Sequence, residues 1–298
     1  SRPRERTARH DYDGDARQDL VVYHPASGQW YIRASSTGQL LGGSPQQWGW
    51  RDAQPVGGDY DGDERSDLAV YHPEHGHWYV RNAAGGLLHG TPAQWGWRDA
   101  AAVPADYDGD GRTDLAVYHA AAGTWYVQPS GVGGPTAGWS ANWGWRETVP
   151  VPADYDGDGV TDLAVYHPAR GDWYIRSSRH GGLLGGGAQN WGWSDAVPAP
   201  ADYDGDGQSD LAVYHPAGAR WYIRSSAQGG FWGGGPLTAD TRNGWPVPGY
   251  YDADQRADLA TYDAAANGRW YILRSTGNSE APNWGWAVGA DGVLSWWR

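Results

Sequence analysis

One motif recurs along the chain at nearly constant intervals, and this repetition restricts the possible folds more than any other feature. The run DYDGD begins at Asp11, Asp59, Asp106, Asp154 and Asp202, and an altered copy begins at Tyr250. Successive copies are separated by 48 residues, except for one interval of 47. A fixed period of this length indicates a repeat architecture in which each unit is one supersecondary structure.

Two aromatic motifs keep the same period. The pair WY begins at Trp30, Trp78, Trp125, Trp173, Trp221 and Trp270. The triplet WGW occupies residues 48–50, 95–97, 143–145, 191–193 and 284–286, and we interpret NGW at 243–245 as its counterpart in the fifth repeat. Each repeat therefore has the same internal order of motifs.

Within one repeat the hydrophobic pattern is that of short strands. In the fourth repeat, residues 149–156 and 162–168 alternate, residues 173–178 are aromatic and β-branched, and residues 189–193 form a fourth candidate. Gly and Ser clusters separate these segments, and no stretch sustains a period of 3.6 residues. Four short strands in a unit of this length describe a blade of a β-propeller.

We therefore predict an all-β, six-bladed β-propeller with four antiparallel strands per blade. The whole chain, residues 1–298, is expected to be a single domain. We expect the two terminal segments to complete one blade together and so close the ring; the alternative is an open stack, which needs polar caps. The approximate repeats are 8–55, 56–102, 103–150, 151–198, 199–246 and 247–298.

Composition excludes several classes of function. The formal net charge is −13 and no basic cluster stands out, which argues against a nucleic-acid partner. No apolar stretch approaches the ~18 residues typical of a membrane span. The chain has no Cys, so it has neither disulfides nor thiol chemistry.

The repeated acidic motif predicts a metal loop. Its pattern is D-x-D-G-D-x-x-x-D, with carboxylates at positions 1, 3, 5 and 9 and a backbone carbonyl available at position 7. Hard oxygen ligands in this number suit Ca²⁺, which takes 6–8 of them. The spacing matches the start of an EF-hand loop, although the last carboxylate comes at position 9 and a strand follows.

This pattern gives five complete Ca²⁺ sites and a sixth, weakened one. The predicted ligands are Asp11, Asp13, Asp15, Arg17 and Asp19; Asp59, Asp61, Asp63, Arg65 and Asp67; Asp106, Asp108, Asp110, Arg112 and Asp114; Asp154, Asp156, Asp158, Val160 and Asp162; Asp202, Asp204, Asp206, Gln208 and Asp210; and Asp252, Asp254 and Asp258. The Arg, Val and Gln residues would contribute their backbone carbonyls.

The loops differ at two positions that favour glycine. Position 6 is Gly in the third to fifth repeats but Ala16, Glu64 and Gln255 in the others, and a residue there is expected to need a positive φ. The sixth loop also has Tyr250 at position 1 and Ala253 at position 4. We predict that the sixth loop binds metal most weakly.

The run DYDGDGxTDLAVY, once per four-stranded unit, resembles the FG-GAP/VCBS repeats of integrin-α-type β-propellers over about residues 8–290. The resemblance implies that the loop joins the first two strands of a blade and binds Ca²⁺. The aromatic motifs look more like those of bacterial secreted VCBS proteins and, more loosely, of integrin-like propeller lectins. The blade count departs from the seven of integrins.

Three further sets of residues recur and are candidates for ligand binding. They are the last Trp of WGW (Trp50, Trp97, Trp145, Trp193), the His of the YHP motif or its variant YHA (His24, His72, His119, His167, His215) and the Arg three residues past the WY tryptophan (Arg33, Arg81, Arg176, Arg224). The alternative for the aromatic residues is blade packing. For His it is a hydrogen bond at a strand end, and for Arg an ion pair with an acid two residues past WGW.

These copies favour a binding module over an enzyme. We found no polar cluster confined to one repeat, whereas an enzyme needs one asymmetric constellation. Copied sites suit multivalent binding, so we predict a secreted, calcium-stabilised, lectin-like module with a glycan partner. One alternative is a protein-adhesion surface that uses the irregular stretches 128–142 and 231–245; another is a polysaccharide-acting enzyme at the central funnel.

Overall fold

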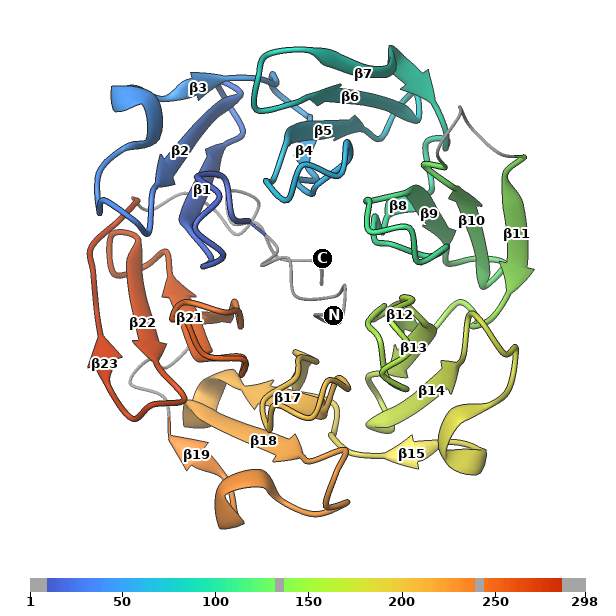
Figure 1. The fold of residues 1–298 in the computed structure, drawn as a ribbon. Coiled ribbons are helices and arrows are strands. Elements are labelled where there is room, and N and C mark those ends of the chain that lie inside the picture. The colour runs from blue at the N-terminus through green and yellow to red at the C-terminus, as the bar shows by residue number, and fades with distance from the viewer. Residues whose placement is uncertain (1–9, 132–136, 239–243, 286–298) are drawn as a thin grey trace. The chain divides into compact units, whose positions relative to one another are not determined.

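A computed structural model describes residues 10–131, 137–238 and 244–285. These residues fall into two compact units, with the division between Arg146 and Glu147. Each unit holds three antiparallel sheets (Figure 1). Each sheet of four strands takes its first strand from the last two residues of one predicted repeat and its other three strands from the next repeat. The chain is therefore an all-β, six-bladed β-propeller, as the repeat pattern predicts.

The first unit in the sequence contains the first three blades. Its sheets are β1 (Leu20–His24), β2 (Gln29–Arg33) and β3 (Gln46–Gln47); β4 (Gln54–Pro55), β5 (Leu68–His72), β6 (His77–Arg81) and β7 (Leu87–Gln94); and β8 (Ala101–Ala102), β9 (Leu115–His119), β10 (Thr124–Gln128) and β11 (Trp139–Asn142). The first sheet has three strands within the described residues.

The second unit contains the other three blades, each with four strands. They are β12 (Val149–Pro150), β13 (Leu163–His167), β14 (Asp172–Arg176) and β15 (Gln189–Asn190); β16 (Val197–Pro198), β17 (Leu211–His215), β18 (Arg220–Arg224) and β19 (Leu237–Thr238); and β20 (Trp245–Pro246), β21 (Leu259–Asp263), β22 (Arg269–Leu273) and β23 (Ser279–Glu280).

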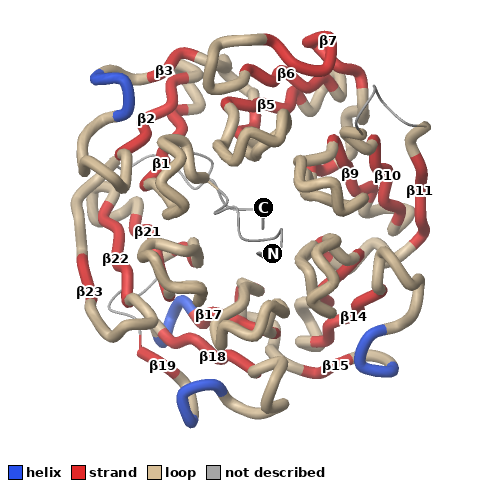
Figure 2. Tube along the Cα trace, in the orientation of Figure 1, coloured by secondary structure: helices blue, strands red, loops and turns tan. Residues whose placement is uncertain are grey.

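The described chain consists of short strands and single 3-10 turns joined by loops (Figure 2). The helical segments are single 3-10 turns: η2 (Leu41–Gly43), η3 (Leu184–Gly186), η4 (Pro216–Gly218) and η5 (Trp232–Gly234). None of the helices in the described ranges has the length and apolar character needed to cross a membrane. The expected ring closure depends on residues 1–9 and 286–298, which lie outside the described residues.

The WY tryptophan forms the centre of each blade. Trp173 is fully buried between Tyr166 and Tyr155, at ring-centroid distances of 5.1 Å and 6.5 Å. Its Nε1 donates a hydrogen bond of 2.7 Å to the backbone carbonyl of Trp191. An aromatic side chain of this size buries about 150–250 Å². The WY tryptophan is buried in every blade, at Trp30, Trp78, Trp125, Trp173, Trp221 and Trp270.

Candidate functional site

The first aspartate of each complete acidic loop holds the turn together. In the fourth loop, Asp154 Oδ1 accepts a hydrogen bond of 2.6 Å from Gly157 N, and Oδ2 accepts one of 2.8 Å from Gly159 N. The same pair of bonds, from positions 4 and 6, is made to Asp11, Asp59, Asp106 and Asp202. Both oxygens of this aspartate therefore stabilise the loop by accepting backbone hydrogen bonds, in addition to any bond to a ligand.

Position 6 adopts a positive φ in every complete loop, including those without glycine. The φ values of Ala16 and Glu64 are 64° and 68°, which confirms the expectation for these two residues. In the sixth loop, Gln255 and Ala253 are not among the residues with positive φ. The backbone of the sixth loop thus differs from that of the complete loops at both glycine positions.

The ninth aspartate is the most deeply buried acid of each loop. Asp162 Oδ2 accepts a hydrogen bond of 2.8 Å from Tyr155 N, and Oδ1 accepts one of 3.0 Å from Ser178 N. Burial raises the pKa of Asp162 to about 7, although these two backbone donors lower it. Burial likewise raises the pKa to about 7 at Asp19, Asp67, Asp114 and Asp210.

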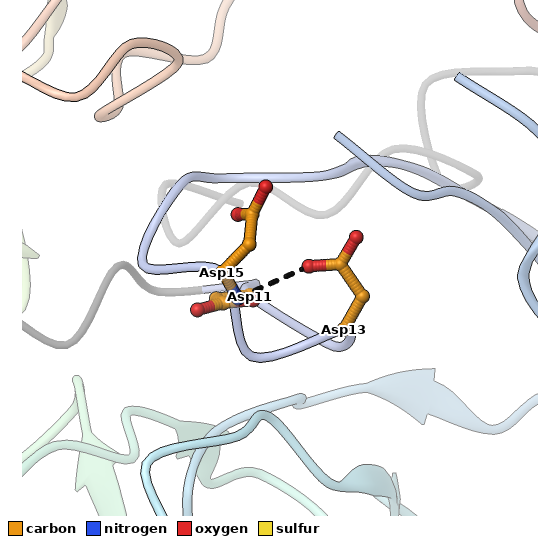
Figure 3. A group of neighbouring side chains, drawn as sticks. All are labelled: Asp11, Asp13 and Asp15. Carbon is orange, nitrogen blue, oxygen red and sulfur yellow. Dashed lines mark hydrogen bonds between the residues drawn. The ribbon is translucent and has the colours of Figure 1, made fainter. Parts of the chain in front are cut away.

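The loops bring carboxylates together three at a time. In the first and fifth loops the acids at positions 1, 3 and 5 offer oxygens within 4.8 Å of one another; Figure 3 shows this group for Asp11, Asp13 and Asp15. In the second to fourth loops the group comprises positions 1, 3 and 9.

Other side chains bind position 5 in several loops, whether or not it belongs to that group. In the fourth loop Asp158 Oδ2 lies 3.0 Å from Arg179 Nε, and in the third loop Ser130 Oγ donates to Asp110. Position 7 is tied to position 5 as well: Val160 N donates a hydrogen bond of 2.9 Å to Asp158 Oδ1.

Neighbouring loops within one unit are linked to each other, which the sequence reasoning missed. The residue at position 8 donates its backbone N–H to the carbonyl of the first residue of the preceding loop, as Ser209 does to Asp154 at 2.7 Å. The glycine at position 4 also lies against the side chain at position 7 of the next loop, as Gly157 does against Gln208. Both contacts require that consecutive loops be equally spaced along the chain. The nearly constant repeat length is therefore the sequence feature that indicates them.

The donor set fits a hard cation. All the side-chain donors are carboxylate oxygens, the type of ligand that Ca²⁺ prefers. Two of them, Asp67 Oδ1 and Asp156 Oδ1, are buried and have no hydrogen-bond partner among the described residues. A buried carboxylate oxygen without a partner is costly, and a cation would satisfy it.

The WGW motif forms a second repeated arrangement, located between consecutive blades of a unit. The ring of Trp50 lies edge-on to Tyr79, with centroids 4.7 Å apart and planes at 86°, and 5.7 Å from the ring of His72. The same arrangement joins Trp97 to Tyr126 and His119, and Trp193 to Tyr222 and His215. We call these three groups the aromatic triads.

Tyrosine hydroxyls fix the backbone of each triad Trp, and the triads are partly exposed to solvent. The hydroxyls of Tyr23, Tyr71 and Tyr166 donate to the backbone carbonyls of Trp50, Trp97 and Trp193. The side chain of Trp50 is 36% exposed, so part of its ring is available to a ligand. Trp145, the fourth Trp predicted to bind a ligand, is half-buried, and its carbonyl accepts a hydrogen bond from the Tyr118 hydroxyl.

The other predicted ligand residues take different roles. His24 ends β1, and the other four histidines end the second strands of their sheets: His72 in β5, His119 in β9, His167 in β13 and His215 in β17. His24 Nδ1 bonds Ser27 Oγ at 2.7 Å. Arg33, Arg176 and Arg224 donate from Nε to carbonyls of their own hairpin turns, and the Arg81 guanidinium lies 5.3 Å above the ring of Trp48. The proposed ion pair with the acids past WGW is therefore not the role of these Arg side chains.

The interpretation of NGW as a fifth WGW is wrong. Trp245 lies in β20 and pairs with Tyr262, the register that Val197 has with Tyr214 in the preceding blade. It is a strand residue of the sixth blade rather than a loop residue of the fifth.

The statement that no polar cluster is confined to one repeat is also wrong. The β5–β6 hairpin carries His72, His75 and His77, whose rings lie close together. The signal was the run YHPEHGHWY, which has Glu74, His75 and His77 where the first repeat has Ala, Ser and Gln. The adhesion loops include residues 132–136 and 239–243, which lie outside the described residues.

Comparison with known sequences identifies the repeats. The profile of the FG-GAP-like repeat matches residues 59–117 and 106–165, so this part of the chain consists of FG-GAP-like repeats. No curated protein sequence matches the chain.

Solved structures with similar folds include proteins of different activity. A lectin from Agrocybe aegerita that recognises non-reducing terminal N-acetylglucosamine is 17% identical, with a TM-score of 0.55 over 89% of this chain and 75% of that one. Virginiamycin B lyase from Staphylococcus aureus is 10% identical, with a TM-score of 0.52 over 93% and 87% of the two chains. A protein of unknown function from Bacteroides caccae is 12% identical, with a TM-score of 0.51 over 87% and 91%. These similarities concern the fold alone.

Proposed function

We propose that this protein is a calcium-stabilised, multivalent carbohydrate-binding module that works outside the cell and is not an enzyme. The observation that carries the proposal is the aromatic triad, which occurs with nearly the same geometry at Trp50, Trp97 and Trp193. The fold is also that of a lectin with known sugar recognition, which supports a binding role.

The chemistry of the triad suits a sugar. A partly exposed indole offers an apolar face to the C–H groups of a pyranose ring, and a neighbouring imidazole offers a hydrogen bond to a hydroxyl. An exposed acid follows two residues past each Trp, at Asp52, Asp99 and Asp195, and can accept hydrogen bonds from further hydroxyls. Asp52 has a φ of 71°, a costly conformation for a residue other than Gly, of the kind that often marks a functional position.

Several weak sites on one chain would act together on a glycan surface. When one site is occupied, the others bind at a high effective concentration, so avidity can exceed the affinity of a single site by a factor of about 10²–10⁴. An array of equivalent sites suits this mode of binding better than catalysis, which needs one acid and one base with different pKa values.

The calcium loops would stabilise the blades rather than contact the sugar. The aspartates at positions 1, 3, 5 and 9, with the carbonyl at position 7, would hold the ion at the entry to the second strand of each blade. Calcium would neutralise the clustered carboxylates and satisfy Asp67 Oδ1 and Asp156 Oδ1. Loops of this kind need an environment rich in Ca²⁺, which is the basis for placing the protein outside the cell.

A glycan array probed in Ca²⁺ and again after chelation tests the proposal. We expect binding to one class of sugar, weakened by chelation because the blades loosen. Trp97→Ala should reduce binding, whereas Leu183→Ala, which truncates a 45% exposed side chain outside the triads, should not. Absence of sugar binding in Ca²⁺ would contradict the proposal. Loss of a protein partner after changes in 231–245 would favour adhesion, and turnover of a polysaccharide would favour an enzyme.

A further inference from the structure

The turn between β5 and β6 differs chemically from its counterparts in the other blades. It reads HPEHGHW, with imidazoles at His72, His75 and His77. The first blade has Ser27 and Gln29 at the two positions that correspond to His75 and His77. Only the second repeat therefore has three histidines in this turn.

The fold places the ring of His75 next to the rings of both His72 and His77. His72 and His77 are directly opposed as the last cross-strand pair of the hairpin, so their Cβ atoms lie about 4.5–5.5 Å apart. The ring of His75 lies 4.8 Å from that of His72 and 5.8 Å from that of His77, measured between centroids. His72 and His77 are half-buried and His75 is exposed, so the cluster can be reached from solvent.

The backbone under the cluster is fixed. Gly76 N donates a hydrogen bond of 2.9 Å to the His72 carbonyl, and Gln94 Nε2 donates one of 2.8 Å to the His75 carbonyl. Gly76 has a φ of 65°, and a Cβ there would lie 2.1 Å from the backbone carbon of Gly96. The turn is thus packed against the chain that follows β7, and the imidazoles project from a rigid support.

We propose that His72, His75 and His77 form a binding site for a divalent transition metal of the zinc class, separate from the acidic loops. Three imidazoles around one tetrahedral Zn²⁺, with Zn–N distances of about 2.0–2.1 Å, place their ring centroids about 5 Å apart. The two centroid distances in this cluster lie on either side of that value. Imidazole nitrogen is a ligand for Zn²⁺, Ni²⁺ and Cu²⁺ rather than for Ca²⁺, which takes oxygen.

The site has three protein ligands, so the fourth position of a tetrahedral ion stays open to water or to a group from another molecule. Glu74, exposed in the same turn, is the nearest acid in sequence. A bound metal would also hold His72, which contacts Trp50 in the first aromatic triad.

Calorimetric titration with Zn²⁺ tests this site, with the acidic loops saturated beforehand by excess Ca²⁺. We expect one saturable Zn²⁺ per chain, and loss of that event in the double variant His75→Ser, His77→Gln. This variant is expected to fold, because the first blade already has Ser and Gln at these turn positions. Its melting temperature in Ca²⁺ provides the check.

Two further variants sharpen the result. The reverse exchange, Ser27→His with Gln29→His, should add a second Zn²⁺ site opposite His24 in the first blade. His119→Ala removes a histidine that corresponds to His72 but has no histidine neighbours in its turn, so it should leave Zn²⁺ uptake unchanged. Equal uptake by the wild type and the His75→Ser, His77→Gln variant, or no saturable uptake by the wild type, would overturn the proposal.

Discussion

The backbone N–H of Ser209 donates a hydrogen bond of 2.7 Å to the backbone carbonyl of Asp154, the first acid of the preceding acidic loop. Equivalent bonds join Ser66 to Asp11, Thr113 to Asp59 and Ala257 to Asp202. A change in one loop therefore acts directly on the backbone of its neighbour in the same unit. If these loops bind Ca²⁺, their occupancy and the stability of adjacent blades should be coupled.

The ninth acid is the most sensitive position of a loop. We predict that Asp162→Asn lowers the free energy of unfolding in Ca²⁺ by about 1–3 kcal/mol, because a buried acceptor of two backbone hydrogen bonds becomes partly a donor. The loss should be smaller in EDTA, where the metal contribution is absent. Asp195→Asn, at an exposed acid outside the loops, is the control. Equal losses with and without Ca²⁺ would argue against a metal role for Asp162.

The sixth loop should contribute least to calcium binding. Tyr250 replaces its first acid, and neither Ala253 nor Gln255 has the positive φ of positions 4 and 6 in the complete loops. Asp204→Asn should therefore reduce the Ca²⁺ count in a titration of metal-free protein, whereas Asp252→Asn should change it little. Six equally tight sites in the wild type would contradict this prediction.

Stability without metal should fall as the pH rises from about 4 to 7. Burial raises the pKa values of Asp19, Asp67, Asp114, Asp162 and Asp210 to about 7 from the usual 3.8 of an aspartate. In this interval the folded state holds more protons than the unfolded state, so the free energy of unfolding decreases with pH. Above pH 7 the trend should flatten.

Calcium should reverse this trend, because it binds the ionised carboxylates. The difference in melting temperature between Ca²⁺ and EDTA should therefore grow from pH 5 to pH 8. Thermal melts at matched ionic strength measure it. A difference that is independent of pH would show that these buried acids are not the groups that bind the metal.

Two glycines with the same φ should respond differently to alanine. Gly171 and Gly186 have φ values of 71° and 72°, but a Cβ at Gly171 would lie 2.1 Å from the Gly192 carbonyl oxygen, whereas nothing lies within 4 Å at Gly186. Gly186→Ala should cost about 1 kcal/mol through backbone strain alone, and Gly171→Ala about 2–4 kcal/mol. Thermal melting of both variants in Ca²⁺ compares them; equal shifts would mean that this contact relaxes freely.

The blades could be predicted because their determinants are local and repeated. The run LAVYH, or its variants LVVYH and LATYD, and the WY pair specify two strands in each copy, and their spacing specifies a hairpin. Contacts between repeats could not be predicted in the same way, since they depend on how consecutive blades are placed. The Trp50–Tyr79 edge contact and the Ser209–Asp154 bond are of this kind.

Two predictions from the sequence, the NGW motif and the absence of a polar cluster confined to one repeat, were wrong for other reasons. NGW resembles WGW in letters, but Trp245 is fixed by its register with Tyr262, which only strand pairing reveals. The histidine cluster does not follow from the repeat period, because the period describes positions that the copies share, whereas His75 and His77 occur in the second copy alone. His75 and His77 are visible in the sequence, but their proximity to His72 follows from the hairpin geometry.

The number of sugar sites per chain tests the central claim most directly. Titration in Ca²⁺ with the monovalent form of a sugar selected on the array should give more than one site, and Trp50→Ala, Trp97→Ala and Trp193→Ala should each remove one. A single site, or a stoichiometry that these three changes leave intact, would contradict the account of a multivalent module built on the aromatic triads.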